Sequence, residues 1–253
     1  DSPYAHWPSL DAAAQSFGGL VHANDGLVTP AIADIFPGTL MALGGVSAMH
    51  SAQRSGKGQF LDVGMYDAMM AFQKSAVAQY GFTGKPNPAG LQRAMTLYPF
   101  DLFPTQDGRI AIAVGQPRHW DLLCAAMERA DLMEDERSFS NEARLANVDW
   151  VEAQICAWTQ TQTRAEIMAK LDGAIPIGPV QTMADIYADP HVQARGMLET
   201  CSPAGDNPDI ALAASPSKFS VTPTTLYQRP PTLGEHNAEV LAEFGIEPPQ
   251  RNG

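Results

Sequence analysis

The sequence has few positive charges, few cysteines and no long uninterrupted run of apolar residues. Its 253 residues carry 16 Lys and Arg against 28 Asp and Glu, a formal net charge of −12. Proteins that bind nucleic acids need clustered cations to neutralise phosphates, so this composition argues against a nucleic-acid partner. The most apolar stretch, residues 40–49, is far shorter than the ~20 residues of a membrane-spanning helix, so no membrane span is predicted.

The three cysteines, Cys124, Cys156 and Cys201, form no CxxC pair and lack the Cys/His spacing that is typical of a zinc site. The sequence therefore predicts neither a disulfide framework nor a metal site. Reduced thiols are typical of the cytoplasm, and the chain opens without the charged and then apolar segment of a secretory signal. We expect a cytoplasmic protein.

The most informative segment places one carboxylate, Asp34, ahead of a stretch of small and apolar residues. This composition predicts a helix over 39–54 that is buried on most sides and ends at Ser55 and Gly56. An acid at the N-terminal end of such a helix meets unpaired backbone N–H groups and the positive end of the helix dipole. Asp34 is thus either a simple helix cap or a charged group that faces a bound molecule.

Seven short motifs occur along the chain in the order found in one enzyme family. By these motifs the chain resembles the C-terminal part of the class III CoA-transferases, a family that also includes carnitine-pathway and formyl-CoA transferases and α-methylacyl-CoA racemases. Each motif is weak by itself, and their common order carries the resemblance. The motifs are residues 9–19 (SLDAAAQSFGG), 34–38 (DIFPG), 56–59 (GKGQ), 107–113 (DGRIAIA), 177–180 (IGPV), 189–197 (DPHVQARGM) and 230–236 (PPTLGEH).

The resemblance implies that Asp34 occupies the position of the family's catalytic aspartate. It implies weaker contacts with the substrate or with CoA for Met65, Gly18, Gly19 and Gln116. Racemases place a glutamate near Gln116, but an amide cannot take up a proton, so this residue is at most a polar wall. The implied reaction moves CoA from an acyl-CoA thioester to a free carboxylic acid through an aspartyl acyl-anhydride and an aspartyl-CoA thioester. CoA then enters as a thioester substrate, with no bound cofactor and no metal.

Two other functions stay open. A racemase would move a proton at the acyl α-carbon between a histidine and the aspartate. The position that matches the racemase histidine is Leu10, which cannot transfer a proton, and Gln15 with Gly18 and Gly19 resembles the pattern of the transferases. The sequence therefore favours the transferase. The chain could also be a non-catalytic subunit or paralogue, although the retained Asp34 argues against that reading.

The resemblance also implies the fold class, which is α/β with part of a Rossmann-like large domain and a smaller α+β domain in an interlocked homodimer. Residues 81–96 are rich in Gly and Pro and predict a linker. It would join the C-terminal part of the large domain, residues 1–80, to the small domain, residues 97–190. Residues 191–253 are expected to form an extended tail that returns to the large domain.

Local patterns predict the individual elements. Asp107-Gly108 predicts the turn of a hairpin between strands at 98–103 and 109–114, and Thr163 with Glu166 predicts a capping box at the start of a helix. Further helices are predicted at 9–19, 67–80, 119–127, 148–158, from 182, at 190–195 and at 235–244, and a strand is predicted at 59–65.

Overall fold

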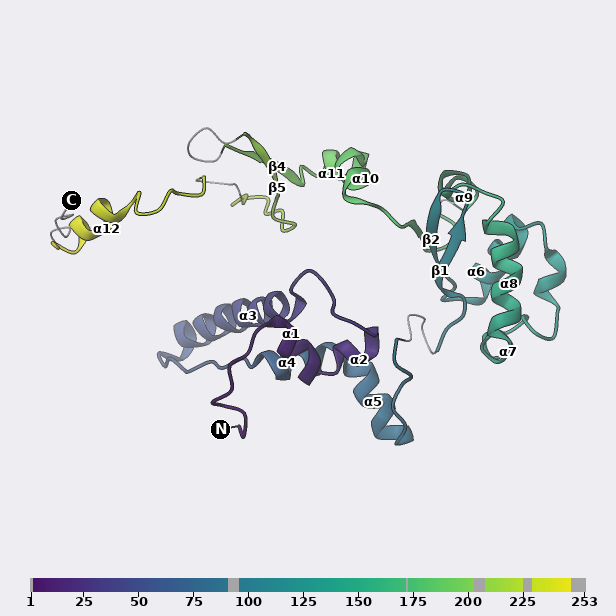
Figure 1. Cartoon of the computed structure of the whole chain (residues 1–253), viewed down its shortest axis with the longest axis horizontal. Coiled ribbons are helices and arrows are strands. Elements are labelled where there is room, and N and C mark those ends of the chain that lie inside the picture. Colours follow the sequence, from purple (N-terminus) through teal and green to yellow (C-terminus); the bar gives the residue numbers. More distant parts are fainter. Residues whose placement is uncertain (1, 91–95, 172, 203–207, 225–228, 247–253) are drawn as a thin grey trace. The chain divides into compact units, whose positions relative to one another are not determined.

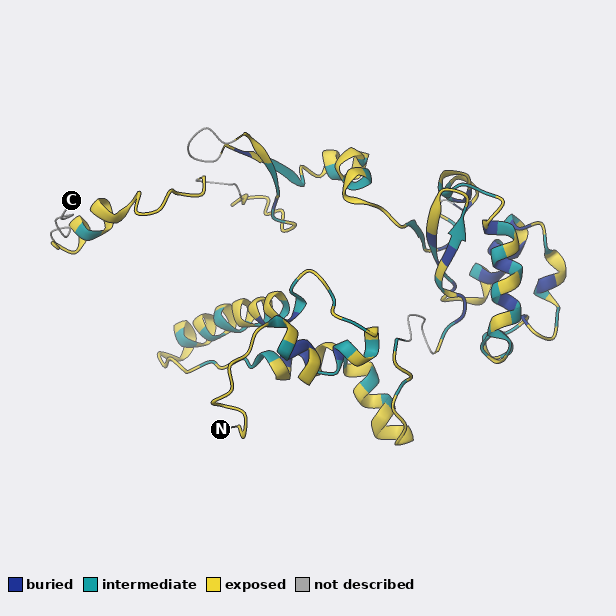
Figure 2. Ribbon diagram, viewed as in Figure 1, coloured by how far each residue is buried: buried dark blue, intermediate teal, exposed yellow. Residues whose placement is uncertain are grey.

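The computed structural model describes residues 2–90, 96–171, 173–202, 208–224 and 229–246. The chain divides into two compact units, Asp1–Pro179 and Val180–Gly253. The first unit holds two separate hydrophobic cores, a small one within residues 14–69 and a larger one within residues 98–175. Figure 2 shows fully buried residues mainly in the elements of the larger core, whereas the helices around the smaller core are largely exposed. The predicted domain boundaries stay predictions, and residues 91–95 of the predicted linker lie outside the described residues.

Helices alone make up the regular structure of the first part of the chain (Figure 1), where the described residues are 2–90. The predicted helices at 9–19, 39–54 and 67–80 are confirmed, although the last is two helices that meet at Gln73. A short helix, α2, was not predicted. The helices are α1 (Asp11–Phe17), α2 (Leu20–Asn24), α3 (Ile32–Ser55), α4 (Met65–Phe72) and α5 (Lys74–Thr83).

The strand predicted at 59–65 is wrong. Residues 57–64 have no regular structure, and Met65 is already the first residue of α4. A strand needs a neighbour for its backbone hydrogen bonds, and no other strand forms within residues 2–90. The segment lies against α3 instead, because Gly44 admits Leu61 so closely that a Cβ atom there would stand 2.9 Å from Leu61 Cδ2.

The expectation that the apolar helix is buried on most sides is also wrong for the described chain. Only 11% of its most apolar window is buried, and Ile35, Leu43 and Val46 are each more than half exposed. The physical reason is that α3 packs mainly on α1 and α4, which cover one side of it. By length and composition, α3 is the single helix in the described residues that could cross a membrane.

The larger core is formed by an antiparallel sheet and the helices beside it. The predicted hairpin is confirmed, since β1 (Phe100–Thr105) and β2 (Gly108–Ala113) pair from Thr105 with Gly108 to Phe100 with Ala113. β3 (Ile177–Pro179) adds an antiparallel third strand next to β2. The helices are α6 (Pro117–Ala126), the 3₁₀ helix η1 (Ala130–Met133), α7 (Asn141–Ala146), α8 (Val148–Thr159) and α9 (Arg164–Leu171).

A capping box starts α9, as the sequence predicts. The Glu166 N–H donates to Thr163 Oγ1 at 3.2 Å, and the Thr163 N–H donates to Glu166 Oε2 at 2.7 Å. Asp107 in the hairpin turn accepts from the Arg164 N–H at 2.8 Å. The turn and the start of the helix are therefore held together, and hydrogen bonding to Arg164 lowers the pKa of Asp107.

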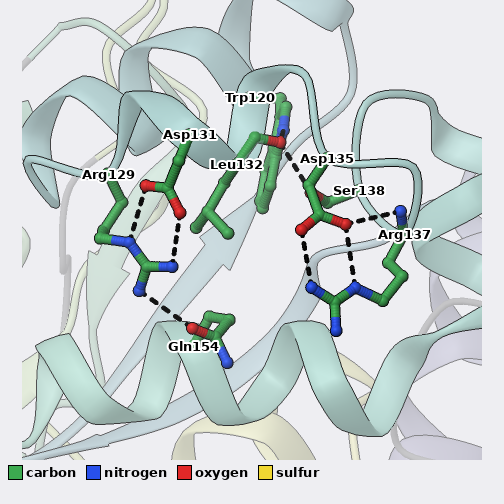
Figure 3. A network of polar contacts seen from close by, with 8 residues as sticks. All are labelled: Trp120, Arg129, Asp131, Leu132, Asp135, Arg137, Ser138 and Gln154. Atoms are coloured by element: carbon green, nitrogen blue, oxygen red, sulfur yellow. Dashed lines mark hydrogen bonds and ion pairs between the residues drawn. The ribbon is translucent and has the colours of Figure 1, made fainter.

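Polar contacts fix the segment between α6 and α7 (Figure 3). The Leu132 carbonyl accepts from the Trp120 indole at 3.3 Å and from the Ser138 hydroxyl at 2.6 Å. Arg137 donates twice to Asp135, at 2.9 and 2.7 Å, which lowers the pKa of that carboxyl to about 2. The bond to Leu132 thus holds the Trp120 indole, which is buried in the larger core.

The second unit contains α10 (Met183–Ala188), α11 (Pro190–Ala194), β4 (Leu198–Cys201), β5 (Ile210–Ala213) and α12 (Asn237–Glu243). The predicted helices in this region are confirmed. The antiparallel β4–β5 pair was not predicted. Together the elements confirm a mixed α/β fold.

Candidate active site

Asp34 lies in the first turn of α3, not ahead of the helix as the sequence suggests, because α3 begins at Ile32. Its backbone N–H donates to the Ala31 carbonyl at 3.1 Å. The residue is exposed, and within the described residues its carboxylate accepts no hydrogen bond and forms no ion pair. The negative charge thus stands at the positive end of the helix dipole without another partner. An exposed carboxylate of this kind can act as a nucleophile.

Two side chains of α1 fix the start of α3. Asp11 Oδ1 accepts from the Ala33 N–H at 2.8 Å, next to Asp34 in sequence. Gln15, which is fully buried, accepts from the Val28 N–H and donates to the Val28 carbonyl, both at 2.9 Å. The second Gln15 N–H donates to Asp11 Oδ2 at 2.7 Å. These bonds hold both the segment before α3 and its first turn.

The two predicted glycine contacts have clear structural roles. A Cβ atom at Gly18 would overlap Met69 Cβ, so glycine is what lets α1 and α4 approach. Gly19 has φ +79°, a left-handed conformation that glycine adopts without strain. Their N–H groups donate to the carbonyls of Ala14 and Ser16 at 2.9 and 3.2 Å. A contact of these N–H groups with a substrate oxygen would need those bonds to break, and a contact with the substrate or with CoA stays a prediction.

Met65 is partly buried against the small core that includes Ala33. It also lines a cavity of about 450 Å³ whose walls include Trp7, Asp62 and Tyr66. Asp34 is not among the lining residues. The structure therefore brings Gly18, Gly19, Met65 and Asp34 to the helices around one core, but it gives Met65 a second role in packing.

Gln116 belongs to the other core. It precedes α6 as its N-cap residue and lines a separate cavity of about 280 Å³. Its side chain forms no capping hydrogen bond. A role as a polar wall agrees with this place, and a contact with substrate stays a prediction.

Nothing in the described part of the chain forms a cluster of three or more His, Cys, Asp or Glu side chains that could hold a metal. The cysteines are free thiols there. Burial raises the pKa of the Cys124 thiol to about 12, so this thiol is a poor nucleophile.

Sequence reasoning did not predict that Asp11 and Gln15 position the start of α3. Their spacing of four places both on one face of a helix, which is a weak signal. The partners, Val28 and Ala33, are 13 and 22 residues from Gln15 and Asp11 respectively, and no local pattern identifies them.

Comparison with known proteins finds relatives that are named as CoA-transferases. The chain is 37% identical over 245 residues to a succinyl-CoA:mesaconate CoA-transferase of Haloarcula hispanica, covering 94% of this chain and 61% of the relative. It is 33% identical over 251 residues to a succinate–glutarate CoA-transferase of Agrobacterium fabrum, covering 96% and 62%. The chain thus spans about three-fifths of the length of these relatives.

Among solved structures, a CAIB/BAIF family protein from Brucella suis matches with a TM-score of 0.78 at 30% identity, covering 96% of this chain and 65% of that one. This agrees with the mixed α/β fold. The model of CoA-transferase family III matches residues 1–237. The chain therefore belongs to CoA-transferase family III.

Proposed function

We propose that the protein transfers coenzyme A from an acyl-CoA to a free carboxylic acid, with Asp34 as the nucleophile. The observation that carries the proposal is the exposed Asp34 carboxylate, which has no partner in the described residues and lies in a helix turn that Asp11 fixes. The relatives are named for succinyl-CoA, mesaconate, succinate and glutarate. Small dicarboxylic acids are therefore the substrate class that the similarity supports.

The proposed reaction is a series of acyl exchanges at the carboxylate of Asp34. Asp34 attacks the thioester carbonyl, the C–S bond breaks, and a mixed anhydride and CoA thiolate result. The thiolate then attacks the aspartyl carbonyl, which releases the donor acid and leaves an aspartyl-CoA thioester. The acceptor carboxylate attacks that thioester to form a second anhydride, and the thiolate takes the acyl group from it, which restores Asp34.

The test is intact mass of the full-length protein after incubation with succinyl-CoA, together with exchange of labelled succinate into succinyl-CoA. The wild type should show a covalent adduct and exchange, and Asp34→Asn should show neither while its far-UV circular dichroism is unchanged. Asp25→Asn is the matched control, because Asp25 is exposed and its φ of +51° suits asparagine. Exchange at the wild-type rate in Asp34→Asn would refute the assignment. Loss of the α-proton without CoA transfer would favour the racemase.

We also propose that the full-length protein is cytoplasmic and works as an interlocked homodimer, as the resemblance to the family implies. The exposed apolar side chains of α3 are a surface that assembly could cover. Light scattering of the full-length protein should give twice the mass of one chain at micromolar concentration. A stable, active monomer would contradict the proposal.

A further inference from the structure

The larger core carries a small cavity that Asp34, the proposed nucleophile, does not line. Its volume is about 280 Å³, and it lies where α6 and α7 begin. Leu97, Val114 and Phe139 supply apolar walls, and Gln116 and Arg144 supply donors. A cavity with apolar walls and a few converging polar groups is typical of a site for a small molecule.

Arg144 is an unusual residue for such a wall, because its side chain is almost completely buried, with 3% exposed. Its Nε donates to the Tyr98 carbonyl at 2.6 Å, and its Nη1 donates to the Ser138 carbonyl at 2.8 Å. The guanidinium also stacks over the Trp120 ring, with its Cζ 4.8 Å from the ring centroid. Both acceptors are neutral.

Arg144 forms no ion pair within the described chain, although Glu142 and Asp121 lie near enough to act against the lowering of its pKa by burial. No bond from Nη2 to a described residue is present. A buried charge outside an ion pair is costly, and burial lowers the pKa of Arg144. A guanidinium has five N–H donors, so donors remain for a ligand in the cavity that Arg144 lines.

The other polar groups of the cavity decide the kind of ligand. The Gln116 side chain makes no capping bond, so its amide is able to donate. Glu142 also lines the cavity, and hydrogen bonding to its own backbone and to Ser140 lowers the pKa of its carboxyl, which favours the charged form. The donors of Arg144 and Gln116 favour a planar anion as the ligand. The nearby carboxyl of Glu142 disfavours a ligand that carries several negative charges.

We propose that this cavity binds one carboxylate group of a small organic acid, held by the guanidinium of Arg144 and the amide of Gln116. The planar fork of arginine matches a carboxylate better than it matches a neutral group. The role of this acid as a substrate rests on the proposed CoA transfer, whereas binding itself is a separate property of the larger core.

The experiment follows the Trp120 indole resonance of the full-length protein by ¹H–¹⁵N NMR, because Arg144 stacks on that ring. Titration with succinate should shift Trp120 and leave Trp7 unchanged, whereas neutral succinamide should leave both unchanged. Gln116→Glu should weaken succinate binding at least tenfold, since it replaces the amide donor by a carboxylate that repels the carboxylate of succinate. Residue 116 is exposed, so the fold can accept the charge. Gln160→Glu, which adds the same charge on an exposed residue outside the cavity, should bind as the wild type does.

Three results would overturn the proposal. They are an equal shift with succinamide, unchanged affinity in Gln116→Glu, or a tighter response to inorganic phosphate or CoA than to succinate. Arg144→Lys should also lose binding, but it removes bonds to two buried carbonyls and could unfold the core, so Gln116→Glu is the deciding variant. Asp34→Asn separates the two proposals, because it should lose CoA exchange and keep the succinate shift at Trp120.

Discussion

Replacement of Gln15 by methionine tests whether α1 positions Asp34. Methionine has a similar length and suits a buried place, so the change removes the carboxamide and leaves the volume nearly constant. The bonds lost are those to the Val28 N–H and carbonyl and to Asp11. The bond from the Ala33 N–H to Asp11 does not involve Gln15 and can persist.

The expected cost follows from the groups left unpaired. A buried backbone donor or acceptor without a partner costs about 1–3 kcal/mol. Two such groups remain at Val28, which is only partly buried, so water can replace part of the loss. We expect the free energy of unfolding to fall by about 2–4 kcal/mol for the two groups together.

Urea denaturation and steady-state kinetics of the full-length protein measure the two consequences. The denaturation midpoint should fall, and kcat for CoA exchange should fall at least tenfold, about 1.4 kcal/mol in activation free energy. The reason is that the segment leading into the turn of Asp34 loses its bonds at Val28, and Asp11 loses its bond from Gln15. Ser16→Ala is the matched control on the same helix, since Ser16 is exposed and bonds only to the Ala12 carbonyl. It should change stability by less than about 0.5 kcal/mol.

The two measurements can refute the reasoning separately. An unchanged denaturation midpoint in Gln15→Met would show that the bonds to Val28 do not stabilise the fold. A lower midpoint with wild-type kcat would show that Gln15 supports the helices but does not position Asp34. Only the joint loss agrees with both parts.

Two further predictions concern packing and charge. Gly18→Ala should lower the free energy of unfolding by about 1–3 kcal/mol in urea denaturation, because its Cβ would overlap Met69. Gly45→Ala, whose Cβ would meet no atom, should raise that free energy by about 0.5–1 kcal/mol. If the two variants changed stability equally, the close packing of Gly18 on Met69 would be contradicted. Asp135 has a pKa lowered to about 2 by Arg137, so its stabilising contribution is present above its unfolded pKa of about 4 and is lost as the pH falls toward 2. The difference in urea midpoint between wild type and Asp135→Asn should shrink over that range. A difference that does not change with pH would show that the ion pair of Asp135 with Arg137 does not stabilise the fold.

The larger core was the more predictable part of the chain. The hairpin follows from Asp107 and the alternating strands, and the start of α9 follows from Thr163 and Glu166, because each depends on residues only a few positions apart. The β4–β5 pair was missed because its strands are short and their pairing is not marked by a two-residue turn. Local chemistry therefore predicts local structure well in this chain.

The errors arose where neighbours distant in sequence decide the structure. Residues 59–65 have the composition of a strand, but a strand requires a partner, and Leu61 packs on Gly44 instead. The apolar composition of α3 predicts burial, yet the described residues cover only one side of it. In both cases composition indicated what surface the segment could bury, and only the fold shows what lies against it.

The candidate site shows the same division. Asp34 could be identified because the reaction needs a carboxylate, and a motif of the family surrounds it. The role of Gln15 could not, because a glutamine in a short helix does not show by itself which backbone segment it holds. Its carboxamide carries one carbonyl and one N–H₂ group, the donor and acceptor types of a peptide bond, and so it pairs with both backbone groups of Val28 as a neighbouring strand would. Glutamate at neutral pH would lack the donor and leucine would lack both groups, so the identity of this residue is set by a backbone segment 13 positions away.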